Sequence, residues 1–140
     1  MKEASRILIL IGFVFAVLGA VFTLAFAIFS VVVASPSSTS MIIDGLKNGT
    51  IHTSFVGTVE QQAAAIQKIF VGLSIIMFIS FAIEVGSSIF AFMANHRDSI
   101  AVTVCALIFA ILTGNIILII GAIMLLVNHS QNNVETIETR

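Results

Sequence analysis

Glu84 is the residue whose type and position most strongly indicate chemistry. It lies within an uninterrupted apolar segment at about residues 69–93, some fifteen residues from one end. A segment of this length can cross a bilayer, and a charged group at its centre costs about 2.5–3.5 kcal/mol on insertion scales. Loss of hydration favours the neutral carboxyl, which can donate a hydrogen bond. An ionisable residue at such a depth is a candidate functional site.

Polar side chains are expected around this carboxyl. On a helix, the same face carries Ser80, Ser87 and Ser88. In the next apolar segment, Thr113 falls within about one turn of the same depth and Asn115 a little further away. No Lys, Arg or His occurs inside any apolar segment, so the sequence excludes an ion pair between Glu84 and a base within the membrane.

Two hypotheses for Glu84 follow. As a functional site it would bind a proton or a cation. As a structural residue it would be a neutral hydrogen-bonding clasp, within the chain or to a partner helix. A transporter usually brings a second polar site, broken helices or internal repeats, and the sequence indicates none of these. The clasp is therefore the favoured interpretation.

Catalysis has little support in the sequence. Cys105 and the three histidines share no spacing, and neither a glycine-rich phosphate loop nor paired carboxylates are present. We expect no enzyme activity, no cofactor and no metal site. The single cysteine also excludes an internal disulfide.

The composition indicates a membrane protein. Of 140 residues, 59% are hydrophobic and only 9% are charged, which is too little charge to cover the surface of a soluble domain. The formal net charge of -1 lacks the basic footprint of a nucleic-acid-binding protein. The lipid bilayer is the expected environment.

Three apolar segments predict an all-α membrane protein with three transmembrane helices in one membrane domain, residues 1–140. The spans are expected at about 7–34, 69–93 and 100–127. An outer loop of about thirty residues, 35–68, contains an amphipathic stretch at 41–47 and a capping box formed by Thr58 and Gln61. Residues 94–99 form a short turn that makes the second and third spans a tight antiparallel hairpin.

The charges flanking these spans predict an orientation. The first apolar segment is longer than the core of a signal peptide and reads as an uncleaved anchor. Lys2, Arg6 and Arg97 fall on one side of the three predicted spans, whereas Lys47, Lys68 and Arg140 fall on the other. Positive residues in short loops favour the cytoplasm. The N-terminus is therefore expected inside the cell membrane and the C-terminus outside it.

Small residues recur at spacings of three and four in the apolar segments and predict close helix packing. In the first segment and the third they are Gly12, Ala16, Gly19, Thr23, Ala106, Ala110, Gly114 and Gly121. These faces suit a tight bundle, an oligomer, or both.

The long first span, the outer loop and the hairpin ending in Ile119-Ile120-Gly121-Ala122-Ile123-Met124-Leu125-Leu126-Val127 resemble a group of small Gram-positive bacterial membrane proteins. That group is catalogued as a domain of unknown function. The resemblance covers most of the chain and implies no active residues.

The sequence thus favours a non-enzymatic accessory or interaction subunit of a larger membrane complex, with another membrane protein or a second copy as partner. The alternative is a homo-oligomeric carrier or pore that is coupled to protons or cations through Glu84.

Overall fold

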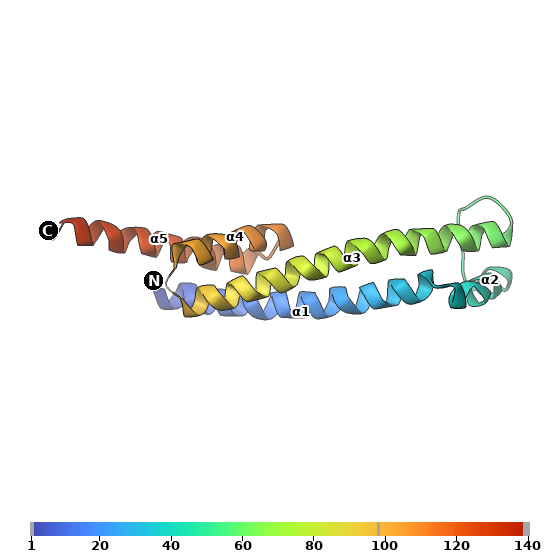
Figure 1. The fold of residues 1–140 in the computed structure, drawn as a ribbon, viewed down its shortest axis with the longest axis horizontal. Helices are drawn as coiled ribbons and strands as arrows, with labels where there is room; N and C mark the ends of the chain where they lie inside the picture. Colours follow the sequence, from blue (N-terminus) through green and yellow to red (C-terminus); the bar gives the residue numbers. More distant parts are fainter. Residues whose placement is uncertain (1, 98, 139–140) are drawn as a thin grey trace. The chain divides into compact units, whose positions relative to one another are not determined.

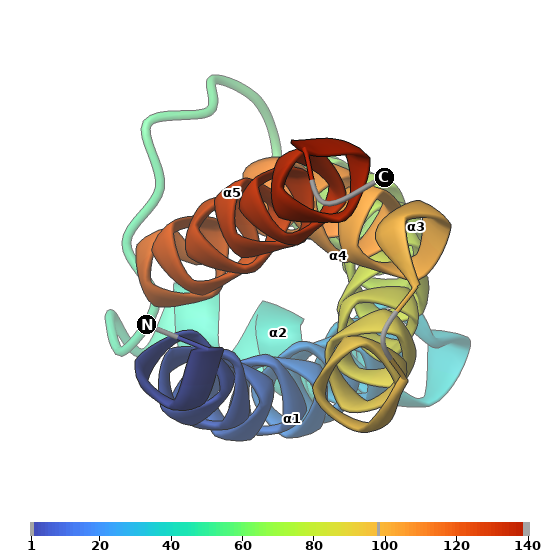
Figure 2. The ribbon, with the colours of Figure 1, turned by 90° about the vertical axis from the view of Figure 1, so that its left-hand side faces the viewer.

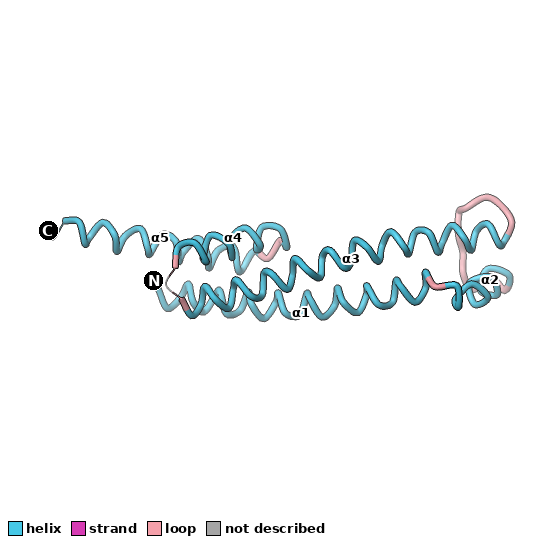
Figure 3. Tube along the Cα trace, viewed as in Figure 1, coloured by secondary structure: helices cyan, strands magenta, loops and turns pink. Residues whose placement is uncertain are grey.

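The computed structural model describes residues 2–97 and 99–138, with side chains described as far as residue 131. All secondary structure in this part of the chain is helical, which confirms the predicted all-α class (Figure 3). In chain order the elements are α1 (Lys2–Ala34), the short 3-10 turn η1 (Pro36–Ser38), α2 (Thr39–Lys47), α3 (Val59–His96), α4 (Ile100–Thr113) and α5 (Ile116–Glu138).

Two helices are long and apolar enough to cross a membrane. Helix α1 has 33 residues and α3 has 38, and their most apolar stretches have mean hydropathies of 2.9 and 2.3. They contain the segments predicted at 7–34 and 69–93. The apolar stretches of α4 and α5 are shorter, at Ile100–Thr113 and Ile116–Gln131.

The prediction of one continuous third helix over 100–127 is wrong. Helix α4 ends at Thr113, and Gly114 adopts the left-handed conformation, with φ 67° and ψ 21°. The N–H of Gly114 donates to Ile111 O and the N–H of Asn115 donates to Ala110 O, at 3.2 and 2.9 Å. This pair of bonds is a Schellman motif, which ends a helix and turns the chain. Helix α5 then runs back beside α4 (Figure 1).

A sequence signal for this break exists at Gly114-Asn115. Glycine is favoured just after a helix because it tolerates positive φ, and asparagine is favoured just before the next helix. The Asn115 carbonyl accepts the first helical bond of α5, from the N–H of Ile119 at 3.0 Å. The break was not predicted, because apolar residues flank this pair on both sides and no polar loop marks the end of a helix.

The structure divides into two compact units, through both of which α1 and α3 run. The first contains residues 1–21 and 80–140. In it, α5 packs closely on α1, because a Cβ at Gly12 would lie 2.7 Å from the Cβ of Leu118. Helix α4 packs on α3, with the Phe90 and Phe109 rings stacked at 5.2 Å. Figure 2 looks along these helices from the end at which α1 begins. The packed core contains Ile9, Ala91, Ala94, Ala106, Ala110, Leu118 and Leu125.

The hairpin of α3 and α4 confirms the predicted tight connection. Helix α3 ends at His96 and α4 begins at Ile100. Phe109 contacts both Phe90 and the position of Gly86, so the two helices run in opposite directions from the turn.

The second unit, residues 22–79, contains the predicted outer loop. Most of that loop is helical, and only residues 48–58 lie between α2 and α3. The side-chain amide of Gln67 donates to Ser35 O at 3.0 Å and to the Thr39 hydroxyl at 2.9 Å. The predicted capping box is confirmed, because the N–H groups of Thr58 and Gln61 each donate to the other's side chain, at 3.0 and 3.3 Å.

Candidate functional site

The carboxyl group of Glu84 lies directly against α1 at Gly19. A Cβ added at Gly19 would lie 2.9 Å from Oε1 and 3.0 Å from Cδ of Glu84. Both residues belong to the first unit. Gly19, predicted as a small residue for helix packing, therefore provides the room that the carboxyl group occupies.

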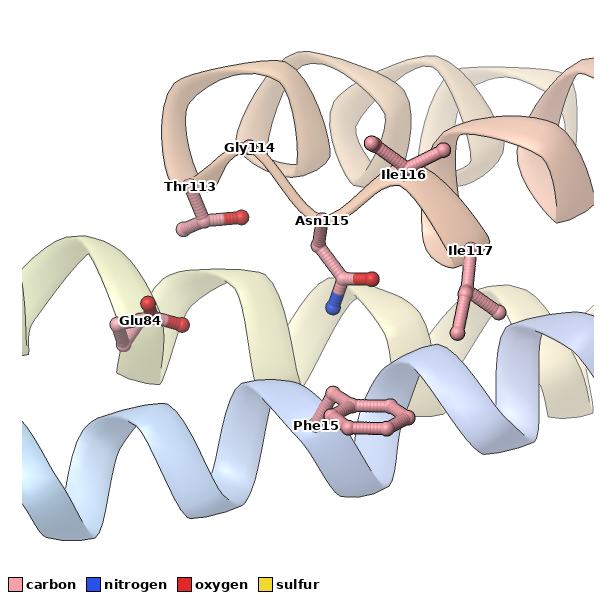
Figure 4. Close-up of a pocket in the computed structure, with 7 residues that line it drawn as sticks. All are labelled: Phe15, Glu84, Thr113, Gly114, Asn115, Ile116 and Ile117. Atoms are coloured by element: carbon pink, nitrogen blue, oxygen red, sulfur yellow. The ribbon is translucent and has the colours of Figure 1, made fainter.

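The break between α4 and α5 faces the Glu84 carboxyl group. It forms a pocket of about 400 Å³ together with Glu84 and the neighbouring face of α1 (Figure 4). The lining residues are Phe15, Glu84, Thr113, Gly114, Asn115, Ile116 and Ile117. Glu84 is the only formally charged residue among them, and the walls combine an aromatic ring, two isoleucines and an irregular stretch of backbone.

Asn115 holds this pocket together. Its Nδ2 donates to the carbonyl oxygen of Gly12 at 2.8 Å, and its Oδ1 accepts from the N–H of Leu118 at 3.1 Å. The second bond is an N-cap, which satisfies an N–H that has no partner within α5. Both the nitrogen and the oxygen of the amide are engaged. Asn115 therefore positions the hairpin formed by α4 and α5 on α1 and is not free to bind a ligand through both atoms.

Thr113 retains hydrogen-bonding capacity. Its hydroxyl lies 3.0 Å from Phe109 O and 3.2 Å from Ala110 O, and it donates back to the last turn of α4. A hydroxyl has two lone pairs as well, so Thr113 can accept a bond from a ligand or from a protonated carboxyl. The last carbonyls of a helix also lack partners within it, and the Schellman motif engages only those of Ala110 and Ile111.

The three serines predicted around Glu84 do not line the pocket. The Ser88 hydroxyl donates to the backbone carbonyl of Glu84, at 2.9 Å, and not to its carboxyl group. Ser80 is half-buried. Ser87 is fully buried, and its hydroxyl has no hydrogen-bond partner among the described residues. The structure thus brings Thr113 and Asn115 to the Glu84 pocket, while the serines lie elsewhere on α3.

The predicted packing residues fall into different environments. Ala16, Ala106 and Ala110 are buried, as close packing requires. Gly12 and Gly121 are points of backbone contact between α1 and α5; a Cβ at Gly121 would lie 2.9 Å from the Ile9 nitrogen. Thr23 is half-buried and belongs to the second unit.

Gly114, predicted as a packing residue, makes no such contact within the chain. Nothing lies within 4 Å of the position that its Cβ would take, so no neighbouring helix requires a glycine there. Its φ of +67° requires one instead, because side chains with a Cβ rarely adopt this conformation.

No group of three or more His, Cys, Asp or Glu residues in the described chain is placed to hold a metal ion. The rings of His96 and His129 each contact the carbonyl one turn earlier in their own helices, through Nδ1 at 2.9 and 2.8 Å. Cys105 is half-buried in α4 and has a free thiol.

No protein-family model, curated protein or solved structure matches this chain.

Proposed function

We propose that this chain is a small, non-enzymatic protein of the cell membrane that binds a proton or another cation at Glu84 and acts as a carrier or pore. The observation that carries the proposal is the break at Gly114, which lies beside Glu84 in one pocket. A broken helix was not predicted, and this expected absence had favoured the clasp over a cation-binding site. With the break present, the cation-binding hypothesis has the stronger support.

The proposal includes a membrane arrangement. Helices α1 and α3 span the bilayer, whereas α4 and α5 enter and leave on the same side. At 1.5 Å per residue, the 14 residues of α4 extend about 21 Å, less than the roughly 30 Å of a hydrocarbon core. Some fifteen residues of the apolar segment of α3 lie between its N-terminal end and Glu84. Glu84, and with it the hairpin tip between α4 and α5, therefore lies within the membrane.

This arrangement changes the expected position of the C-terminus. Three complete spans would place the termini on opposite sides, but a returning hairpin places both on one side. Lys2, Arg6 and Arg97 still favour the cytoplasm for that side. We therefore propose that both termini are cytoplasmic and that the segment between α1 and α3 is external.

The irregular backbone at Gly114, at membrane depth, is consistent with a water-filled cavity beside it. Within the hydrocarbon, such backbone is tolerated where protein covers it or where it lines a water-filled space. Gly114 at the hairpin tip is exposed in this chain. Water around the tip would hydrate Glu84 and give protons or cations a path to it.

Transport by reconstituted protein tests the proposal. The purified protein is placed in liposomes containing a pH-sensitive dye, and proton movement is followed under imposed gradients of pH, Na⁺, K⁺ or an organic cation. We expect flux above that of empty liposomes, its loss in Glu84→Gln, and partial retention in Glu84→Asp, which keeps the charge. Absence of flux under every gradient would reject the carrier or pore.

An accessory subunit is the second candidate, and the same exposed tip supports it. Irregular backbone within the membrane is also tolerated where protein covers it, and a partner helix over the exposed Gly114 would provide that cover. The mass of the complex extracted in mild detergent separates the candidates. A stoichiometric foreign subunit supports the accessory role, whereas a homo-oligomer supports the carrier.

A further inference from the structure

We infer that the ligand of the Glu84 pocket is a lipophilic organic cation, a protonated amine or quaternary onium ion with an apolar body, and not a bare metal ion. This inference rests on the proposed cation-binding function and specifies its ligand class. It follows from the charge, the available oxygen atoms and the walls of the pocket.

The charge of the pocket suits a single positive charge. Glu84 is the only formally charged residue in the lining. The C-terminal end of α4 adds partial negative charge. The N-terminal end of α5 opposes it, but Asn115 Oδ1 accepts from one of the N–H groups there. The remaining imbalance is one carboxylate, which matches a monovalent cation.

The side-chain oxygen atoms of the pocket are too few to coordinate a divalent metal ion without the backbone carbonyls at the end of α4. Divalent cations take six or more oxygen ligands in proteins. Here the Asn115 oxygen already accepts from Leu118, and one side of the Glu84 carboxyl lies against Gly19. The carboxylate and the Thr113 hydroxyl remain as side-chain oxygen ligands. An ammonium or onium ion does not require a complete shell of oxygen atoms.

The walls suit an apolar body. Phe15, Ile116 and Ile117 form much of the lining, and Figure 4 shows the Phe15 ring on α1 below Asn115. The volume of about 400 Å³ is far larger than a bare metal ion requires. An aromatic face also attracts organic cations through its quadrupole.

Equilibrium binding of radiolabelled tetraphenylphosphonium to the purified full-length protein tests the inference. Empty micelles measure partitioning into detergent. We expect saturable binding that a large excess of Na⁺ or K⁺ does not displace. Glu84→Gln should weaken binding about tenfold or more, because it removes the only charge. Phe15→Leu should weaken it about two- to fivefold.

Matched variants and a second readout keep the result interpretable. Gly72→Ala serves as the control, because nothing lies within 4 Å of its Cβ position and it should bind as the unaltered protein does. Circular dichroism checks that each variant is folded. Modification of Glu84 by a hydrophobic carbodiimide reports occupancy independently, since a bound cation protects the carboxylate.

The possible outcomes separate the inference from the function on which it rests. Protection by tetraphenylphosphonium but not by alkali cations supports the inference. Protection by Na⁺ or K⁺ alone overturns it and leaves cation binding at Glu84 intact. If no cation protects Glu84 and the liposomes show no flux, both fail; proton flux alone overturns only the organic ligand.

Discussion

The side-chain amide of Asn115 donates a hydrogen bond of 2.8 Å to the backbone carbonyl of Gly12, although 103 residues separate them in the chain. The same side chain caps α5 through its oxygen. One residue at the hairpin tip therefore begins a helix and attaches it to α1. The pocket around Glu84 depends on this attachment, because Asn115 and the two residues after it are part of its lining.

Asn115→Ala should lower the free energy of unfolding by about 1–3 kcal/mol, because it removes an N-cap and a bond between helices. Asn115→Ser is the matched variant: serine is a good N-cap but too short to reach Gly12, so we expect a smaller loss of about 0.6 kcal/mol. The chain has no Trp or Tyr, so unfolding is best followed by far-ultraviolet circular dichroism. Equal stability of all three proteins would contradict the role of Asn115.

Gly12→Ala should destabilise the protein by about 1–3 kcal/mol, because overpacking forces the helices apart. The new methyl group would lie 2.7 Å from the Leu118 Cβ and 2.9 Å from its Cα. Gly72→Ala tests the same exchange in open space and should be neutral or stabilising by up to about 1 kcal/mol, because alanine favours helix. The measurement is denaturation in mixed micelles. A stable Gly12→Ala protein would show that α1 and α5 do not approach this closely.

Gly114→Ala should lower stability by about 1–2 kcal/mol through backbone strain, since its φ is +67° and no neighbour touches its Cβ position. Gly114→Asn should cost less, because asparagine tolerates the left-handed conformation. A continuous helix over 100–127 predicts the opposite for alanine, which would then stabilise. The order of the three melting temperatures decides between these structures.

Glu60 lies outside the membrane-spanning segments, in the first turn of α3. A hydrogen bond from its own backbone N–H, and then one from the Thr58 side chain, hold the pKa of Glu60 below its usual value. Because the folded pKa is the lower one, the associated stability is present above the unfolded pKa and is lost as pH falls through the folded pKa. Thr58→Val should raise the pKa of Glu60 toward its usual value. Carbon-13 NMR titration in micelles measures it, and an unchanged pKa would exclude the Thr58 bond.

The returning hairpin predicts the labelling of engineered cysteines in a variant whose Cys105 is replaced by alanine. Ser54→Cys, between α2 and α3, should react with a membrane-impermeant maleimide added to intact cells. Ser130→Cys, in α5, should react only after the membrane is permeabilised. Three complete spans would instead place both cysteines outside, so external labelling of Ser130→Cys would reject the proposed arrangement.

Several features of the fold were predictable because they depend on local sequence. The apolar segments at 7–34 and 69–93 identify α1 and α3 by length and composition alone. The capping box of Thr58 and Gln61 is a short-range pattern, and its two hydrogen bonds are present. Glu84 was identifiable as well, because a carboxyl group within a long apolar segment can be recognised from the sequence without knowing how the helices pack.

The sequence by itself determined the helical class, the two long apolar helices and the unusual carboxyl group. Tertiary structure decided that α5 turns back at Gly114, that Gly19 accommodates the Glu84 carboxyl, and that Thr113 and Asn115 border its pocket while Ser80, Ser87 and Ser88 do not. The physical reason lies in the break itself. A Gly-Asn pair inside an apolar run is compatible with a packed straight helix or with a turn, and local sequence does not distinguish them. Contacts with α1, at Gly12 and at Ile9, stabilise the turn, and these come from residues about a hundred positions away.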